Sequence, residues 1–154
     1  MTCKIHLITD GKGRPLGLVL SGGNAADSSF FQAVLDSVQV HDGGPGRPRS
    51  RPERVLADKA YTSKANRDYL TGRGIKVTIP ERDDQKNNRA RRGSAGGRPR
   101  AFDAAAYKGR NVVERCFNRL KNWRGIATRY DKTARSYLGG VTLAAALIWI
   151  KSTV

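Results

Sequence analysis

The chain has 154 residues, enough for a domain with a buried core, and its 29 Lys and Arg against 13 Asp and Glu give a net charge of +16. Such an excess indicates a polyanionic partner: nucleic acid first, an anionic membrane surface second, with a solvated basic surface as the alternative. Two lone cysteines and two histidines exclude the usual zinc spacings. The most apolar run, residues 138–150, is too short to span a bilayer, so we expect a buried helix in which Trp149 and Ile150 pack on the body of the domain.

The first fifty residues predict a hairpin and a helix. Apolar residues alternate within residues 4–20, and the Asp10-Gly11 pair opens a turn between the two strands. Asn24 is a candidate N-cap with Asp27 in the first turn, which predicts a helix reaching Val40.

The middle of the chain alternates short apolar strands with a helix. A Gly/Pro/Arg loop at 41–52 precedes a strand at 54–57, which ends at Asp58. A helix over 63–71 and a strand over 75–79 follow. Hairpin, helix, strand, helix and strand in this order predict an α/β fold with a mixed sheet.

Residues 81–101 differ in composition, with seven basic residues against three acidic ones and almost no apolar residues. We expect a mobile basic loop that contacts a partner, and a disordered linker without a partner is the alternative. Helical patterns return over 103–123 and 133–151, and the sequence indicates no second domain.

A carboxylate on the helix over 103–123 has unusual neighbours. At 100° per residue, Glu114 falls in a narrow stripe at the edge of the apolar arc, together with Tyr107, Arg110 and Lys121. A carboxylate beside so many donors indicates that an anion is bound there as well. An ordinary surface helix with an Arg110–Glu114 pair is the alternative.

Asp58 is the second candidate carboxylate, because ligands gather at the carboxyl ends of strands in open α/β sheets. A turn or N-cap aspartate is the alternative. Two carboxylates in a chain poor in acids suggest a divalent metal site, since Mg²⁺ prefers carboxylate oxygens and substrate phosphate. Two such ions can promote an in-line phosphodiester displacement.

The spacing Tyr107-x2-Arg110-x3-Glu114-x6-Lys121 resembles the signature of insertion-sequence transposases of the IS4/IS5 type. The segments KIHLITDGKGRPL at 4–16, VLADKAYTS at 55–63 and NVVERCFNRLKNWRGIATRYDK at 111–132 are also similar to that family. The resemblance covers essentially the whole chain and is closest to the IS5 group.

The resemblance implies a ribonuclease-H-like fold, a mixed sheet flanked by helices, with an Asp-Asp-Glu triad that binds Mg²⁺ or Mn²⁺. Asp58 matches the second aspartate and Glu114 the glutamate, while Tyr61, Tyr107, Arg110 and Lys121 support the site. The implied function is metal-dependent cleavage and strand transfer of DNA at transposon ends, in the bacterial cytoplasm. The residues expected to contact DNA are basic: Arg89, Arg91, Arg92, Arg98, Arg100, Arg110 and Lys121.

The first aspartate of the family lies upstream of the hairpin that begins this chain, and Asp10 matches a turn aspartate instead. We therefore expect the first carboxylate and the first strand to be missing, which would leave the chain poorly active. A truncated copy and the downstream frame of a frameshifted element both fit. A non-catalytic DNA-binding inhibitor that assembles with full-length transposase or with itself, and a remnant of a decayed element, are the competing functions.

Overall fold

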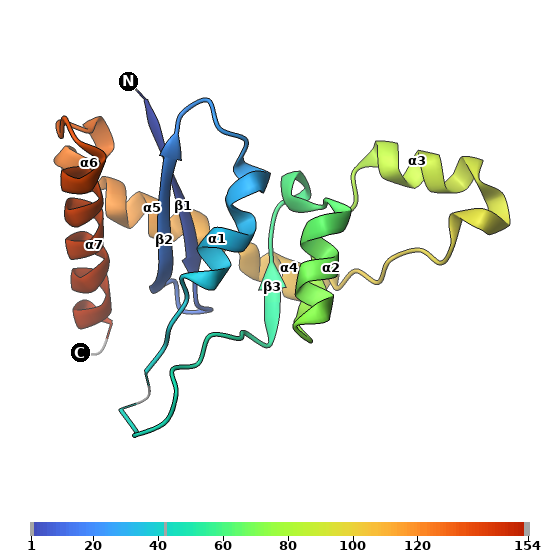
Figure 1. Cartoon of the computed structure of the whole chain (residues 1–154), viewed down its shortest axis with the longest axis horizontal. Helices are drawn as coiled ribbons and strands as arrows, with labels where there is room; N and C mark the ends of the chain where they lie inside the picture. Colours follow the sequence, from blue (N-terminus) through green and yellow to red (C-terminus); the bar gives the residue numbers. More distant parts are fainter. Residues whose placement is uncertain (1, 42, 153–154) are drawn as a thin grey trace. The chain divides into compact units, whose positions relative to one another are not determined.

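The computed structural model describes residues 2–41 and 43–152, and the chain divides into two compact units. The first unit combines Met1–Ser50 with Asn111–Val154, and the second is Arg51–Arg110. Figure 1 shows the elements of each unit.

The first unit is built on the predicted hairpin. Strands β1 (Cys3–Thr9) and β2 (Pro15–Gly22) pair antiparallel, with Ile5 opposite Leu20 and Leu7 opposite Leu18. Alternation places successive side chains on opposite faces. One face of the hairpin is therefore apolar, as the sequence predicts.

Asp10 closes the turn between the two strands, as expected for a turn aspartate. One carboxylate oxygen accepts hydrogen bonds from the backbone N–H groups of Lys12 and Arg14, and the other accepts one from the Arg14 side chain at 2.6 Å. Burial raises the pKa of Asp10, but these hydrogen bonds outweigh it, and the pKa lies below the ordinary value. Both carboxylate oxygens thus serve the turn.

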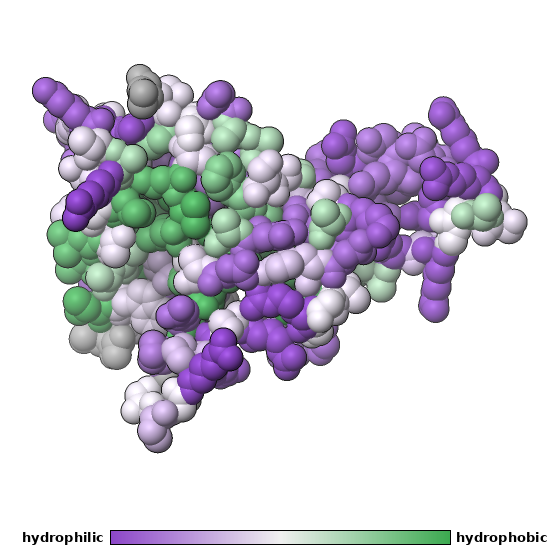
Figure 2. Space-filling view, in the orientation of Figure 1, coloured by the Kyte–Doolittle hydropathy of each residue, from purple (hydrophilic) through white to green (hydrophobic). Residues whose placement is uncertain are grey.

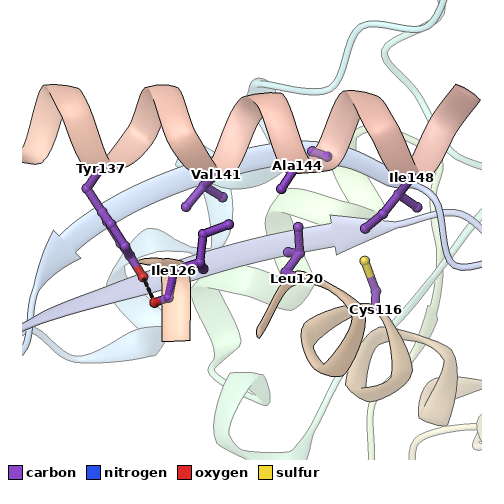
Figure 3. Close-up of a cluster of buried hydrophobic side chains, with 8 residues drawn as sticks. Cys116, Leu120, Ile126, Tyr137, Val141, Ala144 and Ile148 are labelled. Atoms are coloured by element: carbon purple, nitrogen blue, oxygen red, sulfur yellow. Dashed lines mark hydrogen bonds between the residues drawn. The ribbon is translucent and has the colours of Figure 1, made fainter. Parts of the chain in front are cut away.

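Helices α5 (Asn111–Lys121) and α7 (Ala134–Lys151) pack on the apolar face of the hairpin. Side chains from both helices and from α6 (Arg124–Thr128) fill the space between them (Figure 3). The Tyr137 hydroxyl donates to the Ile126 carbonyl at 3.0 Å, which satisfies a buried polar group. The core side chains are Cys116, Leu120, Ile126, Tyr137, Val141, Ala144, Ala145 and Ile148.

The helix predicted at 133–151 is confirmed, and Thr133 caps it by accepting from the Ser136 N–H at 3.1 Å. At its C-terminal end, the predicted packing is confirmed for Trp149 and wrong for Ile150. Trp149 donates to the Pro15 carbonyl at 2.6 Å, with Arg14 over its ring, whereas Ile150 is 61% exposed. A straight helix buries one face, and Ile150 lies on the other. None of the helices in the described part of the chain is long and apolar enough to cross a membrane.

The helix predicted from Asn24 to Val40 is shorter than expected. A 3-10 turn, η1 (Asp27–Phe30), leads into α1 (Phe31–Asp36), and Ala26 rather than Asn24 holds the N-cap position. Helix α1 contacts both strands of the hairpin, and a Cβ added at Gly17 would lie 2.9 Å from the Val34 carbonyl oxygen.

The second unit contains a β-α-β element. Strands β3 (Arg54–Leu56) and β4 (Lys76–Thr78) pair in parallel, and α2 (Lys64–Gly72) connects them. The Ser63 hydroxyl caps α2 by accepting from the Asn66 N–H at 3.2 Å. The expected strands are present, but the mixed sheet differs from expectation: the described strands form two two-stranded sheets, one antiparallel and one parallel.

The basic segment 81–101 is not the irregular loop that the sequence predicts. Helix α3 (Asp83–Arg91) is followed by a 3-10 turn, η3 (Gly93–Gly96). Acidic residues occupy the first turn of α3 and basic residues the last, which complements the helix dipole. Composition alone misses this structure because α3 has no apolar stripe to indicate it.

The continuous helix predicted over 103–123 is interrupted. It consists of α4 (Ala104–Tyr107), a 3-10 turn, η4 (Lys108–Arg110), and α5. Gly109 lies in the interruption, and glycine is a poor residue for a helix interior. The stripe expected at 100° spacing therefore does not lie on one regular helix: Glu114 and Lys121 are on α5, and Tyr107 and Arg110 precede it.

Candidate functional site

Asp58 follows the carboxyl end of β3, two residues after Leu56, as the sequence predicts. It precedes the 3-10 turn η2 (Lys59–Tyr61), and its backbone carbonyl accepts from the Tyr61 N–H at 2.9 Å. Its side chain is 50% exposed and caps no helix. The carboxylate is therefore open to solvent: Asp58 holds the N-cap position of η2, as the turn or N-cap alternative has it, but its side chain makes no capping hydrogen bond.

Arg110 and Tyr107 lie next to Asp58 in the second unit. The Arg110 Nη1 is 3.9 Å from the Asp58 Oδ2, and the Arg110 guanidinium is 5.6 Å from the centre of the Tyr107 ring. The aromatic face attracts the cation and limits its freedom. Arg110 thus links Asp58 to Tyr107, and these three predicted site residues form one cluster. The Tyr61 backbone carbonyl accepts a hydrogen bond from Asn66.

An unpredicted ion pair positions this cluster. The Asp103 side chain caps α4 by accepting from the Ala106 N–H at 2.9 Å and also binds the Arg54 guanidinium of β3 at 2.6 Å. The hydrogen bonds from Ala106 and then Arg54 lower the pKa of Asp103. This contact ties the start of α4 to the strand that leads to Asp58. The N-cap could have been read from the sequence, but the pairing with a residue 49 positions away could not.

Glu114 and Lys121 lie on α5 in the first unit, both exposed, with Glu114 in the first turn and Lys121 at the last residue. A carboxylate in the first turn and an ammonium in the last both suit the helix dipole. Asp58 belongs to the second unit, so the convergence of Asp58 with Glu114 stays a prediction.

The donor chemistry of Asp58 and Glu114 suits Mg²⁺ or Mn²⁺, because both supply exposed carboxylate oxygens. Within residues 2–41 and 43–152, no group of three or more His, Cys, Asp or Glu side chains is arranged to hold a metal ion. A role for these two carboxylates as metal ligands therefore rests on their chemistry and not on a complete group of ligands in the structure.

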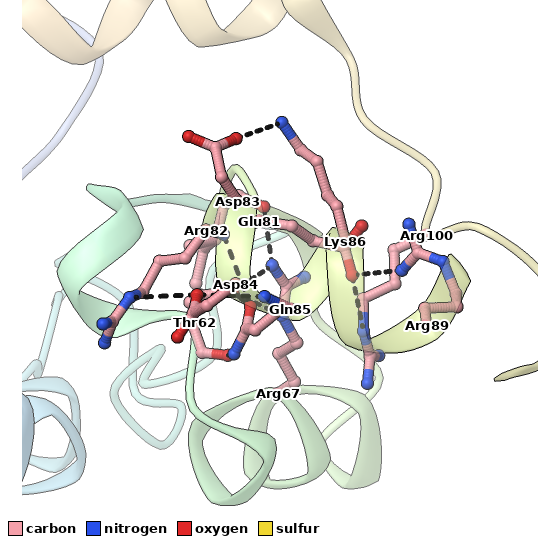
Figure 4. Close-up of polar contacts among 11 residues, drawn as sticks. Thr62, Arg67, Glu81, Arg82, Asp83, Asp84, Gln85, Lys86, Arg89 and Arg100 are labelled. Carbon is pink, nitrogen blue, oxygen red and sulfur yellow. Dashed lines mark hydrogen bonds and ion pairs between the residues drawn. The ribbon is translucent and has the colours of Figure 1, made fainter. Parts of the chain in front are cut away.

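Two basic residues of the 81–101 segment share one carboxylate, Glu81. Arg89 binds Glu81 at 2.6 Å and Arg100 lies 3.7 Å from the same oxygen (Figure 4). Glu81 is 12% exposed, and the hydrogen bond from Arg89 keeps its pKa below the ordinary value although burial acts against this. Beneath it, the buried Arg67 donates to the Thr62 hydroxyl and the Ile79 carbonyl, both at 2.7 Å.

This segment has a markedly polar surface. Figure 2 shows it almost entirely in hydrophilic colours, whereas hydrophobic residues reach the surface of the first unit. Arg91, Arg92, Arg98 and Arg100 are all exposed, as expected for residues that contact a polyanion.

Comparisons with known proteins identify a family for the chain. Residues 1–149 match the transposase DDE domain family. The chain is 32% identical over 145 residues to a putative transposase for insertion sequence element IS402 of Burkholderia cepacia, covering 94% of this chain and 61% of that relative. It is 30% identical over 151 residues to a putative transposase for insertion sequence element IS6501 of Brucella ovis, covering 98% of this chain and all of that relative.

No solved structure matches the chain. The chain spans about three-fifths of the IS402 relative, but the family match extends over nearly all of its own length. The hairpin, the Asp58 cluster and α5 all fall within the matched residues. The chain therefore belongs to the transposase DDE domain family.

Proposed function

We propose that the chain supplies the carboxylate-bearing part of an insertion-sequence transposase of the IS5 group, which cleaves DNA at transposon ends and joins it to a target. The observation that carries the proposal is the Asp58 cluster. A solvent-open carboxylate follows a strand, with a guanidinium 3.9 Å away that an aromatic ring restrains. This combination suits a phosphodiester: the carboxylate for a metal, the cation for a phosphate.

Asp58 and Glu114 would hold Mg²⁺ or Mn²⁺, and the ion would supply Lewis-acid stabilisation of charge on phosphate oxygens. Arg110 orients the Asp58 carboxylate and, when DNA is bound, can share its donors with a phosphate. Tyr107 restrains Arg110. The proposal assigns supporting roles to Tyr61 and Lys121. The proposal includes a ribonuclease-H-like arrangement of the two small sheets and assembly of several transposase chains on DNA.

Substituting each carboxylate tests the proposal. Asp58→Asn and Glu114→Gln remove ligand charge with little change in shape. We expect each to weaken Mn²⁺ binding, followed by electron paramagnetic resonance. When an upstream segment with the family's first aspartate is joined to the chain, each should also lower Mg²⁺-dependent nicking of a transposon-end duplex at least a hundredfold. Glu53→Gln is the control, because Glu53 is an exposed carboxylate in the same unit as Asp58 and forms a salt bridge with Lys76. Wild-type levels of Mn²⁺ binding and nicking in Asp58→Asn and Glu114→Gln would refute the assignment.

DNA binding without catalysis is the second candidate function, and the exposed arginines of the 81–101 segment favour it. Both candidates predict DNA binding that weakens with salt, by about three orders of magnitude between 50 and 200 mM if six phosphates are contacted. Fluorescence anisotropy with a labelled duplex measures this. DNA binding without Mg²⁺-dependent nicking, even when the upstream segment with the first aspartate is joined to the chain, would favour the second candidate.

A further inference from the structure

A pocket of about 620 Å³ lies within the second unit, between the start of α2 and the 81–101 segment. This volume is in the range of small-molecule sites, and it is much more than the roughly 30 Å³ that one water occupies. Its lining contains no aromatic side chain, so stacking of a base is not the basis of recognition. The lining residues are Thr62, Lys64, Glu81, Gln85, Asn88, Arg89, Arg92, Gly96, Arg98 and Arg100.

The charges around the pocket do not balance. Five of the lining side chains are cationic and only Glu81 is anionic. Glu81 is shared by Arg89 and Arg100, and Lys64 pairs with Asp68 outside the lining. Within the described residues, Arg92 and Arg98 form no salt bridge. Two guanidiniums therefore line the pocket without a counter-charge, which favours an anionic ligand.

Glu81 and Gly96 hold the pocket in shape. Glu81 accepts a hydrogen bond from Arg89, so the Arg89 guanidinium is oriented before a ligand arrives, and Arg100 lies 3.7 Å from the same carboxylate oxygen (Figure 4). A Cβ at Gly96 would overlap the Arg89 carbonyl oxygen, so the chain returns past α3 at a distance that only glycine permits. Ordered donors lose less entropy on binding than mobile ones do.

We propose that this pocket binds phosphate groups, and that in the working protein these are neighbouring backbone phosphates of a nucleic-acid strand. Arg92 and Arg98 supply the principal donors, with Lys64 and the amide of Asn88 beside them. The pocket has room for two linked phosphates, so pyrophosphate is expected to bind more tightly than inorganic phosphate. The nucleic-acid source rests on the proposed transposase function, whereas phosphate binding does not.

Calorimetric titration with pyrophosphate in the presence of EDTA tests the site without metal. We expect Arg92→Ala to weaken binding on the order of tenfold, since a charge-assisted hydrogen bond is lost. Lys86→Ala is the matched control: it removes one positive charge from α3 at a residue outside the pocket. Equal affinities in the two variants would overturn the proposal, and so would the absence of pyrophosphate binding by the wild type.

A second measurement identifies the source of the phosphate. A short single-stranded oligonucleotide should displace pyrophosphate from the wild type. Failure to displace it would overturn the nucleic-acid assignment. The Asp58→Asn, Glu114→Gln double variant should bind pyrophosphate as the wild type does, because neither residue lines the pocket. Loss of nicking with retained pyrophosphate binding, or the reverse, therefore separates failure of this site from failure of the carboxylate site.

Discussion

The two units reach stability by different means. Among the described residues, twelve of the buried hydrophobic side chains lie in the first unit and three, Leu70, Ile75 and Ile79, in the second. The second unit instead buries polar groups that bind one another, with Arg67 at 5% exposure and Thr62 at 3%. Apolar contacts are non-directional, whereas a buried hydrogen-bond network is costly unless every member is satisfied. The first unit should therefore tolerate polar change at its surface, and the second should depend on specific partners.

The largest expected effect tests the apolar unit. Leu120 is fully buried between α5 and α7, so Leu120→Ala should destabilise the first unit by about 2–5 kcal/mol through lost contacts and a cavity. Urea unfolding followed by tryptophan fluorescence measures this, because Trp123 and Trp149 both lie in the first unit and Trp149 contacts the hairpin. Leu143→Ala on α7 is the control, since Leu143 is 63% exposed and should change stability by less than about 0.5 kcal/mol. Equal effects would show that the core is placed wrongly.

A smaller effect is expected where α1 crosses the hairpin. Gly17→Ala places a Cβ against the Val34 carbonyl oxygen and the Ser37 hydroxyl, so the helix must move away at a cost of about 1–3 kcal/mol. A Cβ at Gly11 meets nothing within 4 Å, so Gly11→Ala serves as the control. Thermal unfolding by circular dichroism distinguishes the two, and an unaffected Gly17→Ala would mean that α1 does not pack there.

The third effect tests the polar unit through pH. The folded-state pKa of Glu81 is lowered, so its contribution is complete above the ordinary value near 4.5 and is lost as pH falls through the folded value. Glu81→Gln should remove that part of the acid sensitivity and destabilise the second unit by about 1–3 kcal/mol at neutral pH.

Amide hydrogen exchange resolves the two units separately, which a single melting curve cannot do if they unfold independently. Protection should fall in α2 and α3 of Glu81→Gln and stay unchanged in α7. Loss of protection in α7 alone would contradict the claim that Glu81 stabilises the second unit and not the first.

Much of the fold could be predicted because the sequence patterns of single elements agree with the structure that they adopt. The alternation in the hairpin, the Asp10-Gly11 turn and the helical pattern over 133–151 each indicate one structure, and the structure confirms them. The sequence does not predict helix α3, because charge pairs hold it: the Arg89–Glu81 contact spans eight positions and leaves no periodic apolar pattern.

The candidate site could be predicted only in part. The position of Asp58 follows from the apolar strand before it, and Tyr107 and Arg110 from the family spacing. The break at Gly109 was not anticipated, although it moves those two residues off the regular helix that carries Glu114. The Arg54–Asp103 pair depends on the tertiary structure, since the two residues are far apart in the sequence.

The burial of Cys116 has a practical consequence. Its thiol is fully enclosed by the core between α5 and α7, and burial raises its pKa, so it stays protonated and out of reach of alkylating reagents at neutral pH. Cys3, on the hairpin, is only partly buried. The rate at which Cys116 reacts with an alkylating reagent therefore reports how often the first unit opens. Both cysteines are native to the chain, so no engineered label is needed.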